Sequence, residues 1–266
     1  MSVQLGPYAQ TRGYRLEHHA SLASTNDECM ARARAGDAGN LWIVADAQTK
    51  GRGRMARPWA SPPGNLYASL LLIDPSPQSL APQLGFVAGV ALATAVRKCL
   101  PANVDVRLKW PNDLLIDGAK ISGLLVDATQ LPGNVFACVI GFGVNCASHP
   151  SDTPYPATSL AAHGGRADPS ALFAALSDET PRWLDLWARG DNFDAIRKAW
   201  LALALPPGSP LRVKSGETIS EGHFASLDAN GRLMLDCAGM IKTFDAGDVF
   251  PAQPSTPEKT SAGSAI

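Results

Sequence analysis

The tripeptide Pro206-Pro207-Gly208 divides the sequence into two parts with different residue patterns. Behind it, short stretches of alternating apolar and polar residues are separated by turn residues such as Asn230-Gly231. This pattern is typical of a small β-barrel. The stretches lie at residues 211–214, 218–226, 232–235 and 240–244. We therefore expect a large domain over residues 1–207 and a small β-barrel domain over residues 208–252.

The part ahead of this boundary mixes strand-like and helix-like stretches. Strands are expected at residues 14–20, 41–45, 65–73, 104–110, 114–116, 121–128 and 135–141, and helices at residues 24–36, 84–100, 169–189 and 192–204. Thr25 and Glu28 have capping-box spacing, so Ser24 or Thr25 should start the first helix. Asp117-Gly118 predicts a tight hairpin. Residues 1–13 are expected to form a loose leader and residues 253–266 a disordered tail.

Charge and cysteine content limit the classes of protein that fit. The net charge of -1 predicts no general attraction to nucleic acid or to an anionic membrane. Five cysteines without a C-x-x-C pair favour reduced thiols in a cytoplasm over a disulfide framework or a zinc knuckle. The first 20 residues lack the apolar segment of a signal peptide, and no apolar run is long enough to span a membrane.

The segment 48–64 is rich in glycine, proline and arginine and has no periodicity, which predicts a long loop. Within this segment, which we call the arginine loop, lies Gly51-Arg52-Gly53-Arg54-Met55-Ala56-Arg57. Arginine offers a planar fork to carboxylate and phosphate oxygens, and glycine lets the backbone approach a ligand closely. The loop therefore favours a small anionic ligand. A solvated basic loop or an RGG-like contact with nucleic acid remains the alternative. The P-loop motif is absent, and no G-x-G-x-x-G follows a strand, which disfavours a P-loop kinase or a dehydrogenase.

A second motif, Lys109-Trp110-Pro111-Asn112-Asp113, directly follows an expected strand, and Pro111 should end that strand because it has no N–H to donate. Lys120-Ile121-Ser122-Gly123-Leu124-Leu125 and Gly141-Phe142-Gly143-Val144-Asn145 come next. Together with the arginine loop, these segments resemble the biotin–protein ligase family in order and spacing. The resemblance covers residues 21–145 by motif. It implies an α+β fold, in which helices flank a mixed central β-sheet, with an SH3-like β-barrel at the C-terminus.

The resemblance also implies site residues, position by position. Biotin contacts are expected from Ser24, Thr25, Asn26, Gln48, Arg52, Gly53, Arg54 and Lys120. ATP contacts are expected from Arg54, Arg57, Lys109, Asn112 and Asn145. The residues expected to carry the chemistry are Arg54, Lys109, Asp113 and Lys120. Taken singly, Ser24 and Thr25 could merely cap a helix, Asn145 could satisfy a turn, and Trp110 is better explained as a core aromatic.

The implied reaction joins the carboxylate of biotin to the α-phosphate of ATP, with Mg²⁺ on the pyrophosphate leaving group. Two anions must approach, and the arginines and lysines are the available cations. The arginine loop would fold over the adenylate and exclude water. We hypothesise that Asp113 orients or deprotonates the acceptor lysine. The acceptor expected from the family is the biotin carboxyl carrier subunit of acetyl-CoA carboxylase.

The residues ahead of the Ser24-Thr25-Asn26 segment are too few for the DNA-binding domain that some relatives carry, so a ligase-only type without nucleic acid is expected, either a monomer or a homodimer. In relatives, an aromatic residue ahead of a T-S-L-like segment can stack on adenine. Here that segment is Ala157-Thr158-Ser159-Leu160, and Tyr155 lies two residues ahead of it. The residue that stacks on adenine therefore stays unassigned. A lipoate–protein ligase is the alternative enzyme. A nucleic-acid-binding protein is the alternative from another class, and salt-dependent binding of DNA would support it.

Overall fold

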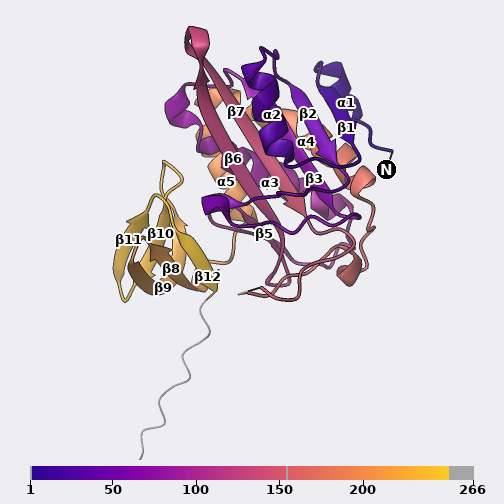
Figure 1. Cartoon of the computed structure of the whole chain (residues 1–266). Helices are drawn as coiled ribbons and strands as arrows, with labels where there is room; N and C mark the ends of the chain where they lie inside the picture. Colours follow the sequence, from indigo (N-terminus) through magenta and orange to yellow (C-terminus); the bar gives the residue numbers. More distant parts are fainter. Residues whose placement is uncertain (1, 154, 252–266) are drawn as a thin grey trace, which may run out of the picture.

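The computed structural model describes residues 2–153 and 155–251, which form a large unit and a small C-terminal unit (Figure 1). The large unit is built on a 7-stranded sheet with the order β1-β2-β3-β7-β6-β5-β4. Its strands are β1 (Arg15–His19), β2 (Leu41–Ala45), β3 (Leu66–Ile73), β4 (Val106–Lys109), β5 (Asp113–Ile116), β6 (Ala119–Leu131) and β7 (Val135–Val144). β1 and β2 are parallel and the other neighbours are antiparallel, which confirms the predicted mixed sheet.

Helices cover the two faces of this sheet unequally. The helices are α1 (Pro7–Thr11), α2 (Thr25–Arg34), α3 (Gln83–Lys98), α4 (Pro169–Trp187) and α5 (Phe193–Leu203). Residues of α3, α4 and α5 form one large apolar core with one face of the sheet, whereas α2 forms a small core of its own on the opposite face. Figure 1 shows α2 in front of the sheet and α3 behind it. The part of the front face that α2 leaves uncovered is therefore available to a ligand.

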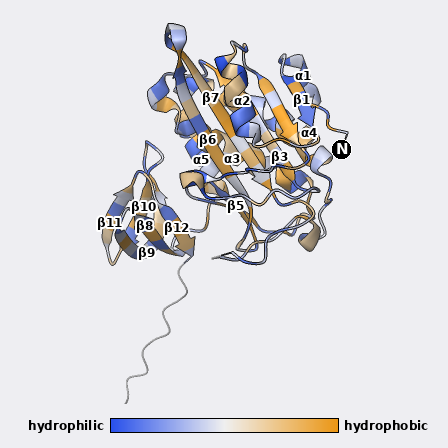
Figure 2. Ribbon diagram, viewed as in Figure 1, coloured by the Kyte–Doolittle hydropathy of each residue, from blue (hydrophilic) through white to orange (hydrophobic). Residues whose placement is uncertain are grey.

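The alternation of residues along the strands explains this division. In β7, Phe136, Cys138, Ile140 and Phe142 lie in the large core. Between them, Gly141 and Gly143 face the other side of the sheet, because successive side chains of a strand point to opposite faces. Figure 2 shows hydrophobic residues concentrated in the central strands, as expected for a sheet with a buried face.

The small unit is a 5-stranded antiparallel sheet with the order β11-β10-β9-β8-β12. Its strands are β8 (Pro210–Ser215), β9 (Thr218–Leu227), β10 (Leu233–Cys237), β11 (Met240–Phe244) and β12 (Asp248–Pro251). The predicted small β domain is thus confirmed. β12 was not predicted, because its four residues end in a proline and show little alternation; its pairing with β8 supplies the partner that fixes it.

The expectation of a loose leader was wrong for residues 7–11. This segment forms α1 and packs on α4, where Asp178 and Asp185 lie beside it. The backbone N–H of Gly6 donates to Ser177 Oγ at 2.9 Å, and Arg12 forms an ion pair with Asp185 at 2.6 Å. These partners are more than 160 residues away in sequence, so local pattern could not reveal them. The predicted tail, residues 253–266, lies outside the described residues.

Other local predictions are confirmed. Ser24 is the N-cap of α2, with its Oγ accepting from the N–H of Asp27 at 3.3 Å. Asp117 and Gly118 both have positive φ, as the tight hairpin between β5 and β6 requires. Short 3-10 turns lie at Arg54–Ala56, Gln78–Leu80, Pro132–Asn134, Ala161–His163 and Ala188–Gly190. In the part of the chain that the structure describes, no helix combines the length and apolar character that crossing a membrane would need.

Trp110 attaches the small unit to the large one. Its ring is buried, and its Nε1–H donates to the carbonyl oxygen of Gly231 at 3.1 Å. Gly231 has a φ of +80° and lies against the ring of Phe86, so the turn between β9 and β10 fits between the tryptophan and the core. Trp42 is also buried, but its Nε1 has no hydrogen-bond partner among the described residues.

We predict that Trp110→Phe destabilises the protein by about 1 kcal/mol more than Trp42→Phe, because only the first substitution also removes a hydrogen bond and leaves a buried carbonyl unpaired. Urea-induced unfolding of both variants measures the difference. Equal losses would show that the contact between Trp110 and Gly231 contributes little to the attachment.

Candidate functional site

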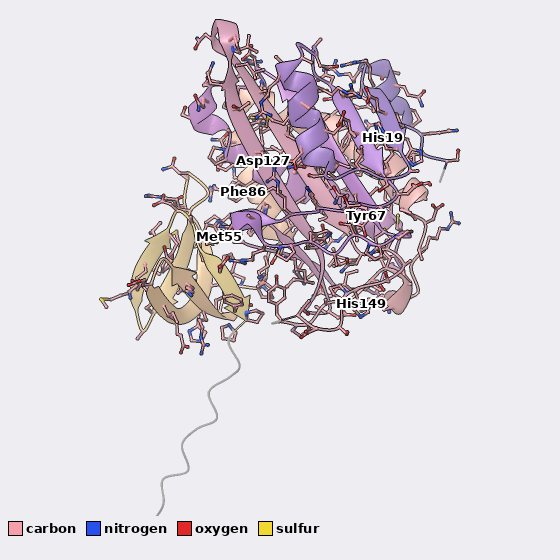
Figure 3. The ribbon with its side chains drawn as sticks, viewed as in Figure 1. His19, Met55, Tyr67, Phe86, Asp127 and His149 are labelled. Atoms are coloured by element: carbon pink, nitrogen blue, oxygen red, sulfur yellow. The ribbon has the colours of Figure 1, made fainter. Side chains whose placement is uncertain are left out.

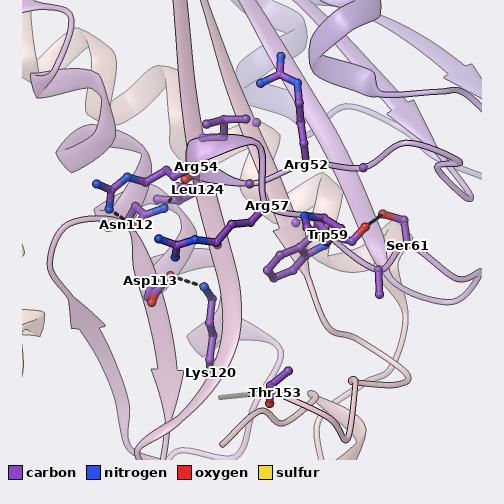
Figure 4. A pocket seen from close by; sticks show the side chains of 18 of the residues that line it. Arg52, Arg54, Arg57, Trp59, Ser61, Asn112, Asp113, Lys120, Leu124 and Thr153 are labelled. Carbon is purple, nitrogen blue, oxygen red and sulfur yellow. Dashed lines mark hydrogen bonds and ion pairs between the residues drawn. The ribbon is translucent and has the colours of Figure 1, made fainter. Parts of the chain in front are cut away.

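A cavity of about 890 Å³ lies on the front face of the sheet, beside α2 and beneath the arginine loop. Every residue that the sequence predicted for the site lines it, as do Lys214, Asp248, Val249 and Phe250 of the small unit. The predicted residues are Ser24, Thr25, Asn26, Gln48, Arg52, Gly53, Arg54, Arg57, Lys109, Asn112, Asp113, Lys120 and Asn145. Figure 4 shows the part that contains the arginines, Asp113 and Lys120.

One end of the cavity is polar and closely hydrogen-bonded. Gln48 Oε1 accepts from the backbone N–H of Thr25 at 2.8 Å and lies 3.2 Å from its hydroxyl. Ser69 Oγ lies 2.7 Å from Thr25 Oγ1 and 2.6 Å from Asn26 Oδ1. Gln48 Nε2 donates to Ser61 Oγ at 3.1 Å, which joins the loop to this network. The start of α2 is therefore held in place by side chains of the sheet and of the loop.

Glycines form the floor of the cavity. A Cβ atom added to Gly141 would lie 2.2 Å from Asn26 Oδ1, and one added to Gly143 would lie 2.7 Å from the indole of Trp59. Side chains at these two positions would displace their neighbours, so the sheet must present bare backbone here. Trp59 rests on this floor, and its buried Nε1 has no hydrogen-bond partner among the described residues.

The opposite end of the cavity holds a buried carboxylate between two ammonium groups. Asp113 Oδ2 lies 2.9 Å from Lys109 Nζ, and Asp113 Oδ1 lies 2.5 Å from Lys120 Nζ. Asp113 pairs with Lys109 across β4 and β5, and Lys120 sits at a register shift between β5 and β6. Burial alone would raise the pKa of Asp113, but the two ammonium groups outweigh it and hold this pKa below its usual range. Burial alone would lower the pKa of Lys120, but Asp113 reverses this effect and raises it.

The hypothesis that Asp113 orients or deprotonates the acceptor lysine stays a prediction, and this geometry favours a role other than that of proton acceptor. Both of its oxygens are already paired, its side chain is only 8% exposed, and its low pKa makes it a poor proton acceptor. Asp113 instead keeps two cations close together, which would otherwise repel each other.

The small unit closes the cavity from the side. Arg57 forms an ion pair with Asp248, and Arg54 donates to the carbonyl oxygen of Gly247 at 3.2 Å. Lys109 Nζ donates to the carbonyl oxygen of Val249 at 2.5 Å. The start of β12 therefore gives negatively charged or partially negative oxygens to three of the predicted cations. Figure 3 shows Met55, at the tip of the arginine loop, on the side of the small unit.

Arg52 lies differently from the other loop arginines. Its guanidinium is paired with Asp27 and Asp127 at 2.8 Å each, and in Figure 4 it points away from Asp113 and Lys120. These hydrogen bonds, to Asp27 first and to Asp127 second, raise the pKa of Arg52. Arg52 lines the cavity, but its guanidinium is paired with two carboxylates. The predicted contact of this side chain with biotin stays a prediction.

Two aromatic residues of the cavity were not among the predicted site residues. Lys120 Nζ lies 5.5 Å from the ring centroid of Trp59 and 5.3 Å from that of Tyr155, and it donates to the Tyr155 hydroxyl at 3.2 Å. Lys109 Nζ lies 5.3 Å from the Tyr155 ring. The position of Trp59 within the arginine loop was the available signal. For Tyr155 the signal was the resemblance to the family, in which an aromatic can precede the segment that corresponds to Ala157-Thr158-Ser159-Leu160, but its position two residues ahead left it unassigned.

Comparisons with known proteins identify the family of the chain. Residues 23–145 match the model of the biotin/lipoate A/B protein ligase family. The biotin–[acetyl-CoA-carboxylase] ligase of Paracoccus denitrificans is 34% identical over 241 residues, which cover 87% of this chain and 98% of the relative. The ligase of the same description from Mycobacterium tuberculosis is 31% identical, over 89% of each chain.

Solved structures agree on the fold. The biotin protein ligase from Aquifex aeolicus in complex with biotin and ATP superposes with a TM-score of 0.76 at 24% identity, and the match covers 90% of this chain and 99% of that one.

The fold and the site thus define a member of the biotin and lipoate protein ligases. Within that class, the extent of the identity with curated relatives shows that the chain belongs to the biotin–protein ligase family.

We predict that Asp113→Asn destabilises the protein by about 3–5 kcal/mol near neutral pH, because two buried ammonium groups lose their counter-ion. The pKa of Asp113 is lowered by folding, so its contribution is fully present above its unfolded pKa of about 3.9 and is lost as pH falls through the folded value. The pKa of Lys120 is raised, so its contribution is lost only as pH rises above about 10.

Urea unfolding of the wild type and of Asp113→Asn between about pH 3 and 9 measures this effect. The difference in unfolding free energy should be flat from about pH 5 to 9 and should shrink below about pH 4. A difference that stays constant down to pH 3 would contradict the role of Asp113 as a counter-ion.

Proposed function

We propose that the chain activates biotin with ATP to form biotinyl-5′-AMP and then transfers biotin to a lysine of a biotin carboxyl carrier protein. Pyrophosphate leaves in the first step and AMP in the second. The observation that carries the proposal is one cavity with a polar end at Thr25 and Gln48 and a cationic end at Lys109 and Lys120. The curated relatives named biotin–[acetyl-CoA-carboxylase] ligase support the carboxylase carrier as the acceptor.

The polar end suits the ureido ring of biotin. Ser24, Thr25 and Gln48 offer hydroxyl, amide and backbone groups there. Asn26 takes part indirectly, because its Oδ1 lies beside Ser69 and its Nδ2 donates to Asp127 at 2.9 Å. A lipoate-binding site would need an apolar end instead, so these polar groups favour biotin. The acyl tail is proposed to lie between the two ends of the cavity, beside Trp59 and Leu124, which line it.

The cationic end suits the reacting carboxylate and phosphates. Two unit charges at about 4 Å repel by roughly 4 kcal/mol at an effective dielectric constant of 20, so the biotin carboxylate and the α-phosphate need fixed cations between them. Lys120 lies nearest the glycine floor and is proposed to meet both groups. Lys109, Arg54 and Arg57 are proposed to hold the other phosphates, and Asn112 and Asn145 the remainder of ATP. Trp59 and Tyr155 provide flat faces in the cavity that fit a purine ring.

The second step needs a neutral amine on the acceptor. A free lysine has a pKa of about 10.4, so only about one amine in a few thousand is neutral at pH 7. Since Asp113 is a counter-ion, we propose that the positive charges around the cavity lower the pKa of the incoming lysine. The arginine loop excludes water from the mixed anhydride until that lysine arrives.

Mg²⁺ would neutralise the pyrophosphate leaving group when bound. Among the described residues, no group of three or more His, Cys, Asp or Glu could hold a metal by itself. Asp152 and Asp248 line the cavity and offer the oxygen ligands that Mg²⁺ prefers, so they are the residues that would hold it together with the phosphates.

Further expectations belong to this proposal. The domain division at residues 207 and 208, a cytoplasmic location and a monomeric or homodimeric state remain predictions. The proposal includes no nucleic-acid partner, because the net charge of -1 gives the chain no general attraction to nucleic acid. An ATP-independent shift of labelled DNA by the chain, lost at high salt, would contradict that expectation.

The proposed activity is tested by incorporation of labelled biotin into a biotin carboxyl carrier domain. Incorporation should require ATP and should release one pyrophosphate for each biotin bound. Lipoate in place of biotin should give little incorporation. Equal use of lipoate would instead support the lipoate–protein ligase alternative.

We predict that Arg54→Ala speeds the loss of biotinyl-AMP from the enzyme by about tenfold to a hundredfold, because a charge-assisted contact with the phosphate is removed. Filter binding of labelled adenylate measures the rate. Arg212→Ala is the matched control, since Arg212 is an exposed arginine of the small unit that pairs with Glu221 outside the cavity. Adenylate retention at the wild-type level in Arg54→Ala would remove this arginine from the mechanism.

A further inference from the structure

The arginine loop is internally hydrogen-bonded, so it can move as one piece. The N–H of Trp59 donates to the carbonyl of Gly51 at 2.9 Å, and the N–H of Gly53 donates to the carbonyl of Arg57 at 2.8 Å. Arg52 and Pro58 also form an isolated β-bridge. Such a piece must be attached to the protein at identifiable points if it is to stay closed over a ligand.

Side chains of the loop attach it on two sides. Arg54 and Arg57 reach the small unit, as described above. On the other side, the Arg52 guanidinium donates to Asp27 on α2 and to Asp127 on β6. These two acids are far apart in the sequence. The Arg57 and Arg54 contacts involve cations proposed to bind phosphates, so ATP would compete for them. The Arg52 contacts are independent of those phosphate-binding groups.

Asp127 is the more constrained of the two acids that hold Arg52. Its side chain is 25% exposed, whereas that of Asp27 is 55% exposed. Its Oδ2 also accepts from Asn26 Nδ2 at 2.9 Å, so one carboxylate contacts both the loop and the start of α2. Asn26 is in turn fixed by Ser69 and by the bare backbone of Gly141. An exposed ion pair is weak because of solvent screening and side-chain entropy, and a partly buried, doubly bonded one is stronger.

We propose that Asp127 is a positioning residue for retention of the adenylate. It holds the arginine loop closed through Arg52, and it aligns the biotin end of the cavity through Asn26. Asp127 itself does not line the cavity, and it touches neither substrate nor phosphate. Figure 3 marks Asp127 on the strand beside α2. This role deepens the proposed function and rests on it, because loop closure matters only if the enzyme forms an adenylate that must be protected from water.

The test compares Asp127→Asn with the wild type. The asparagine keeps an oxygen that can accept from Asn26, but it loses the charge that holds Arg52. Biotinyl-AMP should be lost from the variant roughly threefold to tenfold faster, while the rate of adenylate formation at saturating substrates changes less than twofold. Asp127→Glu should recover most of the retention. A purely structural defect would slow both steps together and would not be rescued.

A second measurement needs no substrate. Trypsin cleaves after the loop arginines, and cleavage of the ligand-free variant should be about threefold to tenfold faster than that of the wild type. Added salt should speed cleavage of the wild type more than that of Asp127→Asn, because the variant lacks one of the ion pairs that hold the loop and that salt screens. Glu221→Gln is the matched control, since it removes one acid from the exposed pair with Arg212 far from the loop.

Finally, Arg52→Gln combined with Asp127→Asn should release the adenylate no faster than Arg52→Gln alone, because Arg52→Gln already removes the contact with Asp127. Additive effects, or unchanged cleavage and retention in Asp127→Asn, would overturn the proposal. If the wild type formed no biotinyl-AMP at all, the proposed function would fail, whereas the trypsin result would still report on the attachment of the loop.

Discussion

The buried ion pairs of Asp113 are the interaction on which the site depends. Two ammonium groups are placed within 3 Å of one carboxylate on the floor of a cavity that must accept anions. Without Asp113, Lys109 and Lys120 would repel each other and turn towards solvent. With it, the sheet presents two fixed cations on β4 and β6, the strands on either side of β5. Preorganised charge of this kind stabilises a developing negative charge without further rearrangement.

The rest of the cavity follows from the unequal covering of the sheet. Three helices cover one face and form the large core with it, and only a few residues of that core, such as Leu124 and Phe142, also line the cavity. The other face carries α2 and the arginine loop, and the glycines of β6 and β7 let Asn26 and Trp59 approach the sheet closely enough to line the cavity. In β7, alternate residues therefore serve different purposes. Residues on one face, such as Ile140, pack in the core, and residues on the other face, such as Gly141 and Gly143, line the cavity.

The sequence predicted most of what local pattern can determine. Strand alternation, the cap at Ser24 and the Asp117-Gly118 turn depend on neighbours a few residues apart, and all were found where expected. The motif residues also gathered in one cavity. The ion pair of Arg52 with Asp127 could not be predicted, because the two residues are 75 positions apart in sequence. The pairing of Asp113 with Lys109 and Lys120 is local, but it depends on how β4, β5 and β6 pair and on a register shift that the sequence does not show. The same holds for α1 and β12, whose folding depends on α4 and β8.

The position of β12 in the chain has a consequence for biosynthesis. Asp248 and the carbonyls of Gly247 and Val249 complete the wall of the cavity, yet they belong to the last strand of the described residues. A nascent chain emerging from the ribosome would form the large sheet and its core first, since domains generally fold as units in the order of synthesis. The cations of the cavity would then face open water until β12 paired with β8. Completion of the cavity wall is thus delayed until β12 has been synthesised and has paired with β8.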